Sequence, residues 1–321
     1  MAGFSESFGY GQRSDQKDEP VRSTERQGLL IAACGFSTFS FGDAVIKTMS
    51  GQWSALAAGS LRFAIATAVL GVLLVMKEGA GALRMPRPGV QLLRGSGIAL
   101  GTGAFFSALF LLPMAEATAI LFASPMLTSL LAAVVLREPV RKATWIAICI
   151  AFCGVLLVVR PNFALYGWAI VLPLLAAMGV SMLIIGNRIG ANLASGLAMQ
   201  FYSSAVGASL LILATMVCAS LGVGGVELSW PPVSVVIRCA IVAFTATTGH
   251  WLVYTATTRA GAALIAPMTY IQFLISLMLG LILFGDWPDA LSLVGAALIV
   301  SAGLILWREG RATDLAQTDA A

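Results

Sequence analysis

Four ionisable side chains stand inside apolar stretches of this sequence, namely Asp43, Lys47, Arg62 and His250. At the centre of a membrane-spanning helix a charged side chain costs about 2.5–3.5 kcal/mol, so it usually faces a partner or a polar cavity. Arg62 lies too deep in its stretch to reach water easily, and its planar fork fits a carboxylate or phosphate. We therefore predict that Arg62 binds an anionic group of a substrate. The alternative is a permanent pair with Asp43 or with helix carbonyls.

Asp43 and Lys47 are four residues apart, so they share one face of a helix and can form an ion pair. Lys47 is close to the end of its apolar stretch, and its long side chain can also reach the membrane surface. Asp43 is deeper and its side chain is shorter. Two roles stay open for Asp43, which are a partner for Arg62 and a binding site for a coupling proton.

His250 lies in a stretch dense with threonines, which indicates a helix that faces a polar interior. It either contacts a substrate or is a neutral imidazole held by neighbouring hydroxyls. The side chains of Trp251, Tyr254, Tyr270 and Gln272 could stack on a flat heterocycle and hydrogen-bond to it. All five are candidate substrate-binding residues. Helix packing or anchoring at the membrane surface is the alternative for the last four.

The sequence predicts no metal site and no cofactor. It has one histidine and five cysteines without a CxxC pair, so the clustered ligands that a metal needs are missing. It also lacks a GxxxxGK[ST] phosphate loop, so it does not encode ATP hydrolysis. Asp43 and Asp286 each follow Phe-Gly, and two such carboxylates would suit an intramembrane aspartyl protease, which we keep as a remote alternative. A channel or a passive scaffold is a further class of function that the sequence leaves open.

Composition places these residues in a membrane. Of the 321 residues 59% are hydrophobic and 11% are charged, and the mean hydropathy of +0.91 exceeds that of soluble proteins. The apolar stretches are long enough for a helix to cross about 30 Å of hydrocarbon. We predict an all-α integral membrane protein with ten transmembrane helices, near 28–48, 54–76, 92–112, 115–136, 143–159, 166–186, 195–219, 236–258, 261–284 and 290–307.

Two polar tails flank these helices. Residues 1–27 are rich in Ser, Gly and Gln with charges of both signs, which is typical of a disordered segment. The first apolar run is long enough to span the membrane, so we expect it to be a retained helix and not a cleaved signal peptide. Residues 309–321 form the second tail.

The distribution of positive charge predicts the orientation. Cytoplasmic loops collect Lys and Arg, and with the N-terminus inside, all but four of the 19 such residues fall in inside segments. Arg160 and Arg238 fall outside, and Lys47 and Arg62 lie within spans. Both termini are therefore expected in the cytoplasm.

The chain also repeats itself. Residues 128–160 resemble 273–308, with Glu138 matching Asp286, and residues 46–59 resemble 187–200, with Lys47 matching Arg188. Each half, 28–160 and 166–308, then has five spans, and an odd number inverts the second half in the membrane. Inverted repeats are a common plan of transporters, because the two halves can exchange conformations.

These features resemble the EamA family of the drug/metabolite transporter superfamily. The similarity rests on residues 112–140 and 261–289, on GDAVIK in the first span and on SLRFAIA in the second. The resemblance implies ten helices in two inverted EamA repeats, with a central cavity lined mainly by helices other than the fifth and tenth. It also implies alternating-access transport across the bacterial inner (cytoplasmic) membrane, and no enzyme activity.

The resemblance leaves the cargo open. Similar members carry riboflavin or S-adenosylmethionine, which suggests a vitamin or a nucleoside-like solute, whereas others export amino acids, opine metallophores or drugs. The partners expected are the lipid bilayer and a small-molecule substrate, with a coupling proton and a homodimer as further candidates. No nucleic-acid partner is expected.

Overall fold

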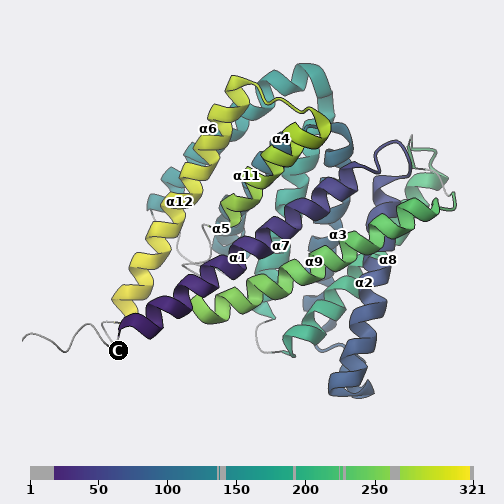
Figure 1. The fold of residues 1–321 in the computed structure, drawn as a ribbon, viewed down its shortest axis with the longest axis horizontal. Coiled ribbons are helices and arrows are strands. Elements are labelled where there is room, and N and C mark those ends of the chain that lie inside the picture. Colours follow the sequence, from purple (N-terminus) through teal and green to yellow (C-terminus); the bar gives the residue numbers. More distant parts are fainter. Residues whose placement is uncertain are drawn as a thin grey trace, which may run out of the picture.

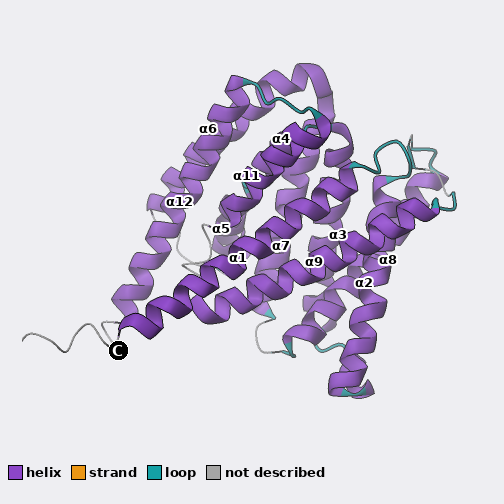
Figure 2. Cartoon of the chain, in the orientation of Figure 1, coloured by secondary structure: helices purple, strands orange, loops and turns teal. Residues whose placement is uncertain are grey.

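The protein is built from helices. The computed structural model describes residues 18–135, 137, 142–190, 193–223, 225–226, 229–260 and 268–318, and this part of the chain contains no strand (Figure 2). The first 17 and last three residues of the predicted tails, and Glu138, lie outside the described residues.

Long helices run through the whole bundle (Figure 1). The first half contains α1 (Asp18–Lys47), α2 (Ala55–Glu78), η1 (Ala80–Leu83), α3 (Pro88–Leu111), α4 (Met114–Leu121), α5 (Ser124–Val135) and α6 (Lys142–Tyr166). The second contains η2 (Gly167–Val171), α7 (Leu172–Ile189), α8 (Gly196–Ser220), α9 (Val233–Ala260), α11 (Thr269–Leu279), η4 (Gly280–Phe284) and α12 (Ala290–Thr318).

Length and composition agree with a multi-pass membrane protein. Seven helical segments of the described chain are long and apolar enough to cross a bilayer, and three shorter apolar helices lie at 145–158, 269–284 and 290–305. The all-α fold class is confirmed. The predicted tails are partly wrong, because α1 already begins at Asp18 and α12 continues to Thr318. A polar sequence that adjoins an apolar helix can simply extend it.

Two prolines mark helix ends. The predicted span 115–136 is divided, since α4 ends at Leu121 and α5 begins at Ser124, directly before Pro125. Pro173 occupies the first turn of α7, where its missing N–H leaves no helical hydrogen bond unmade. The break between α4 and α5 matters for function, because it brings non-helical backbone to the middle of the bundle.

The helices associate in pairs. In Figure 1, α1 runs beside α9 and α6 beside α12, and extensive contacts also join α3 to α7 and α2 to α8. Glycines allow the close approach. A Cβ at Gly179 of α7 would lie 2.3 Å from the backbone nitrogen of Gly101 in α3, and one at Gly154 of α6 would lie 2.7 Å from the carbonyl oxygen of Gly295 in α12.

A buried arginine joins three helices at the end of the bundle where α3 begins. Arg94 Nε donates to Asn187 Oδ1 of α7 at 2.7 Å, and its Nη1 donates to Gln91 Oε1 at 2.6 Å and to the Met199 carbonyl of α8 at 2.9 Å. Only 5% of Arg94 is exposed. The charge is thus satisfied inside the protein, which makes Arg94 a structural residue.

We expect Gly179→Ala to destabilise the protein by about 1–3 kcal/mol, because the new methyl group would meet α3 backbone that cannot move aside. The measurement is the free energy of unfolding in mixed micelles. Gly89→Ala is the matched control, since a Cβ there meets nothing within 4 Å. Equal stability of the two variants would contradict the close packing of α3 on α7.

Candidate functional site

A cavity of about 390 Å³ lies between the helices. Its walls come from α1, α2, α3, α7, α8, α9 and α11 and from the α4–α5 break, and none of its lining residues belongs to α6 or α12. For the described residues, this agrees with the expectation of a cavity lined mainly by helices other than the fifth and tenth of the predicted ten. The volume falls within the range of pockets that bind small organic molecules.

The cavity wall is largely aromatic with a few polar groups. The phenylalanines that line it are Phe39, Phe63, Phe105, Phe106 and Phe122. The polar side chains that line it are Asp43, Arg62, Thr102, Ser124, Gln200, Thr245, His250, Thr269 and Gln272. Asp43 and Arg62 are the charged pair among these lining residues, so the wall as a whole carries no net charge when His250 is neutral.

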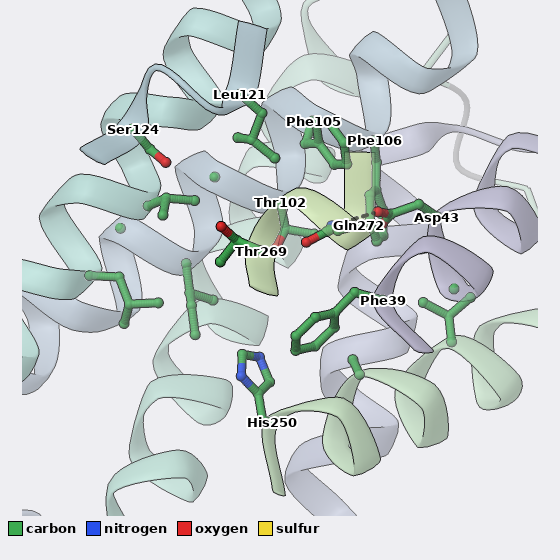
Figure 3. Close-up of a pocket in the computed structure, with 18 of the residues that line it drawn as sticks. Phe39, Asp43, Thr102, Phe105, Phe106, Leu121, Ser124, His250, Thr269 and Gln272 are labelled. Carbon is green, nitrogen blue, oxygen red and sulfur yellow. Dashed lines mark hydrogen bonds between the residues drawn. The ribbon is translucent and has the colours of Figure 1, made fainter. Parts of the chain in front are cut away.

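Asp43 is held against α11. Its Oδ2 accepts a hydrogen bond from Gln272 Nε2 at 3.3 Å, and Figure 3 shows the two side chains together in the cavity. One turn earlier on α1, Ser40 Oγ donates to the Gln272 carbonyl at 2.8 Å and accepts from Ser276 Oγ at 3.3 Å. Gln272 is therefore fixed through both its backbone and its side chain.

Arg62 has no such anchor. Its guanidinium carbon lies 4.2 Å from the ring centroid of Phe63 and 5.5 Å from that of Phe106, both within range of a cation–π interaction. Its Nε is buried and has no hydrogen-bond partner. Asp43 and Arg62 attract each other electrostatically across the cavity. They make no ion pair within 4.0 Å in the described structure, so the predicted direct pair does not form.

His250 also faces the cavity. Its ring lies 4.9 Å from the ring of Phe39 in an edge-on arrangement, and Figure 3 shows the two rings side by side. Thr245, about one turn earlier on α9, lines the same wall, so the threonine-rich stretch does face the interior.

Lys47 has a partner that the sequence did not reveal. The predicted pair with Asp43 is wrong, because Lys47 Nζ forms an ion pair with Asp286, from the loop before α12, and donates to the Leu112 carbonyl at 2.9 Å. Asp286 also accepts the Met114 N–H at 3.1 Å. This group, which we call the Lys47–Asp286 cluster, joins α1, the α3–α4 connection and the α12 loop at one end of the bundle.

Three aromatic candidates lie away from the cavity. Trp251 and Tyr254 are 64% and 66% exposed, and neither lines the cavity. Trp251 follows His250 and is turned about 100° from it around α9. Tyr254 lies about one helical turn after His250. Tyr270 packs edge-on against Phe122, with its hydroxyl against Gly303 of α12. None of the three lines the cavity in this structure, and their contact with a substrate stays a prediction.

Several lining residues were missed from the sequence. Thr102 stands in a glycine-rich run whose glycines pack on α7, and Ser124 sits at the α4–α5 break. For Ser124 the sequence did contain a signal, because Pro125 directly follows it and a proline inside a spanning segment indicates a break in the helix. Gln200 and Thr269 had no distinguishing signal in their apolar surroundings.

The site offers no constellation for enzymatic chemistry. Asp286 is engaged by Lys47 and the Met114 amide, while Asp43 binds Gln272, so the two aspartates have separate environments. Among the residues that the structure describes, no three His, Cys, Asp or Glu side chains gather as metal ligands do. The arrangement is suited to binding a solute.

Spanning helices around a solute-sized polar cavity define a multi-pass membrane transporter. The model of the EamA-like transporter family matches residues 26–160. The match covers the first half of the chain, which is therefore similar to the EamA family of the drug/metabolite transporter superfamily, and the apolar helices and the relatives support a multi-pass inner-membrane protein.

Curated relatives extend the similarity over both halves. The chain is 26% identical to an S-adenosylmethionine uptake transporter of Rickettsia prowazekii over 88% of this chain and 93% of the relative. It is 27% identical to a riboflavin transporter of Rhizobium johnstonii over 72% and 74%. It is 27% identical to the pseudopaline exporter CntI of Pseudomonas aeruginosa over 88% and 96%. These relatives are named as transporters.

A solved crystal structure has the same fold. It superposes with a TM-score of 0.56, covers 90% of this chain and 99% of its own, and is 21% identical in sequence.

We expect Lys47 and Asp286 to be strongly coupled, because only 13% and 16% of their side chains are exposed. A double-mutant cycle with Lys47→Met and Asp286→Asn should give a coupling free energy of about 1–3 kcal/mol in the unfolding measurement. The control cycle pairs Arg238→Met with Gln52→Ala, which remove an exposed hydrogen bond of 2.7 Å. It should give about 0.5 kcal/mol or less. Additive effects of the first pair would contradict the ion pair.

Proposed function

We propose that the protein is a secondary-active transporter that moves a small organic metabolite through the central cavity by alternating access. The observation that carries the proposal is a cavity inside the spanning helices whose wall combines a carboxylate, a guanidinium with an unused N–H and several aromatic rings. The cargo is a nucleoside-like or vitamin solute, as for the relatives named for S-adenosylmethionine and riboflavin. Export of an opine metallophore, an amino acid or a drug is the second candidate, which the relative named for pseudopaline favours.

The helix pairs support a fold of ten spans in two inverted repeats. In that fold α1 corresponds to α7, α3 to α9, and the α4–α5 segment to the segment that contains α11. The contacts of α1 with α9 then correspond to those of α3 with α7, and the contacts of α1 with α11 to those of α5 with α7. Two further contacts join α2 to α8 and α6 to α12. In the proposed repeats each of these pairs consists of equivalent helices, as expected for helices that lie beside the pseudo-twofold axis relating the two halves.

Two hydrogen bonds give the same support at the level of single residues. The sequence alignment that matches Lys47 with Arg188 also matches Ser40 with Ser181, and the alignment of the later segments matches Gln272 with Ser124. Ser40 Oγ donates to the Gln272 carbonyl at 2.8 Å, and Ser181 Oγ donates to the Ser124 carbonyl at 2.9 Å. Equivalent residues thus make equivalent contacts in both halves.

We assign the end that carries the Lys47–Asp286 cluster to the outer side, since the positive-inside rule places both termini in the cytoplasm. That end is further tied by Arg238, which donates to the Thr48 carbonyl at 2.9 Å and to Gln52 Oε1 at 2.7 Å. The cavity lining reaches Gln200, close to the start of α8 at the opposite end. These features favour a state closed to the outside, with solute access from the cytoplasm.

A coupling proton and a homodimer stay predictions. Asp43 is the candidate proton site, because it is a carboxylate on the cavity wall that faces Arg62 of α2, His250 of α9 and Gln272 of α11. A proton on Asp43 would change its attraction for Arg62 and hence the affinity of the site for a charged solute.

The proposal is tested by counterflow in proteoliposomes loaded with S-adenosylmethionine, riboflavin, amino acids or nucleosides. We expect saturable exchange of at least one solute. For a solute whose anionic group binds Arg62, Arg62→Ala should reduce the exchange at least about tenfold, because it removes a charged hydrogen-bond donor. Arg259→Ala, an exposed arginine near the end of α9, is the control and should behave as the wild type. Absence of saturable exchange for the whole panel would remove the central support of the proposal.

For proton coupling we expect Asp43→Asn to abolish the pH dependence of uptake while binding stays measurable, because asparagine cannot carry a proton at this position. The measurements are the initial uptake rate and solute binding, both between about pH 5 and about pH 8. An unchanged pH profile in Asp43→Asn would exclude Asp43 as the coupling site.

A further inference from the structure

Arg94, which is buried, and Arg62, which is half-buried on the cavity wall, differ in what satisfies them. Arg94 donates to side-chain and backbone oxygens of three helices, whereas Arg62 leaves a buried Nε–H without a partner. A buried donor without an acceptor costs about 1–3 kcal/mol, and more when the group is charged. An arginine kept for packing alone would be expected to have acceptors within the fold. Arg62 therefore has the character of a group that completes its hydrogen bonds with a ligand.

Asp43 has one carboxylate oxygen left for a ligand on the cavity wall. Gln272 donates to its Oδ2, and its Oδ1 has no hydrogen bond within the described part of the chain. Asp43 and Arg62 attract each other, yet each is kept in place by its own surroundings, Asp43 by Gln272 and Arg62 by the rings of Phe63 and Phe106. The cavity thus presents a separated acceptor and donor of opposite charge.

The charge balance restricts the ligand. A simple anion would satisfy Arg62 but bring a second negative charge toward Asp43, and a simple cation would do the reverse toward Arg62. A molecule with both charges a short distance apart satisfies both residues without adding net charge to a low-dielectric cavity. The rest of such a molecule would lie on the aromatic wall formed by Phe39, Phe105 and His250.

We propose that the cavity recognises the zwitterionic amino-carboxylate end of its solute, with the carboxylate on the Arg62 guanidinium and the ammonium on the Asp43 carboxylate. This inference rests on the proposed function and narrows it. It favours solutes that carry an amino-acid end over neutral flat solutes such as riboflavin; S-adenosylmethionine has such an end, and its sulfonium adds one further positive charge outside it. No covalent step is involved.

The test is equilibrium binding to the full chain in lipid nanodiscs, with two probes that differ in the amino-carboxylate end. S-adenosylhomocysteine carries that end, and 5′-methylthioadenosine has the same nucleoside and thioether without it. We expect the first to bind at least about tenfold more tightly, as two charged hydrogen-bonding contacts should. Arg62→Gln and Asp43→Asn should each remove that preference, which is measured as the ratio of the two dissociation constants within each variant.

Two further variants separate recognition from folding. Arg62→Lys keeps the charge but loses the planar fork, so it should retain part of the preference. Arg259→Gln, at an exposed site, should retain all of it. Thermal unfolding of each variant in the same nanodiscs shows whether the fold is intact.

Equal binding of the two probes, or a preference for S-adenosylhomocysteine that survives both Arg62→Gln and Asp43→Asn, would overturn the inference. Absence of binding by S-adenosylhomocysteine and by a second zwitterion, L-phenylalanine, would also overturn it. Riboflavin counterflow without zwitterion binding would leave the transporter assignment standing and remove only this inference. Zwitterion binding without any counterflow would leave this inference standing and remove the support for the transporter assignment.

Discussion

A guanidinium buried among apolar helices needs hydrogen-bond acceptors, and how this protein meets that need divides its structure into framework and site. Arg94 receives its acceptors from α3, α7 and α8 and holds these helices together. Arg62 receives none for its Nε and is supported by aromatic rings instead. Because an unmet charged donor is costly inside a membrane, such a guanidinium is expected beside a cavity that water or a solute can enter, and Arg62 lines one.

Close helix packing is what makes such a site possible. Glycines in α3, α6, α7 and α12 bring backbones together in pairs, and this places most of the side-chain volume of the bundle away from those contacts. The break between α4 and α5 and the fixed position of Gln272 on α11 then shape a cavity between the paired helices. The same packing leaves α6 and α12 in contact with each other and outside the cavity wall.

The Lys47–Asp286 cluster connects the site to the rest of the bundle. Lys47 lies one helical turn beyond Asp43 on α1, so the helix that carries one wall of the cavity is also the helix that closes one end. Asp43 and the Lys47–Asp286 cluster are therefore connected through a single helix.

The sequence by itself determined the all-α class, most of the apolar segments and the presence of ionisable residues that needed a polar environment, because hydrophobic length and charge cost are properties of local segments. It also indicated that Arg62, Asp43, His250 and Gln272 could share a cavity, and they do line one. Only the tertiary structure decided which charges meet. Lys47 binds Asp286, 239 residues away, and not its neighbour Asp43, while Trp251, Tyr254 and Tyr270 turn away from the cavity. The physical reason is that partner choice depends on the rotation of each helix about its axis and on the helix packed beside it, and neither is encoded in the spacing of residues within one segment.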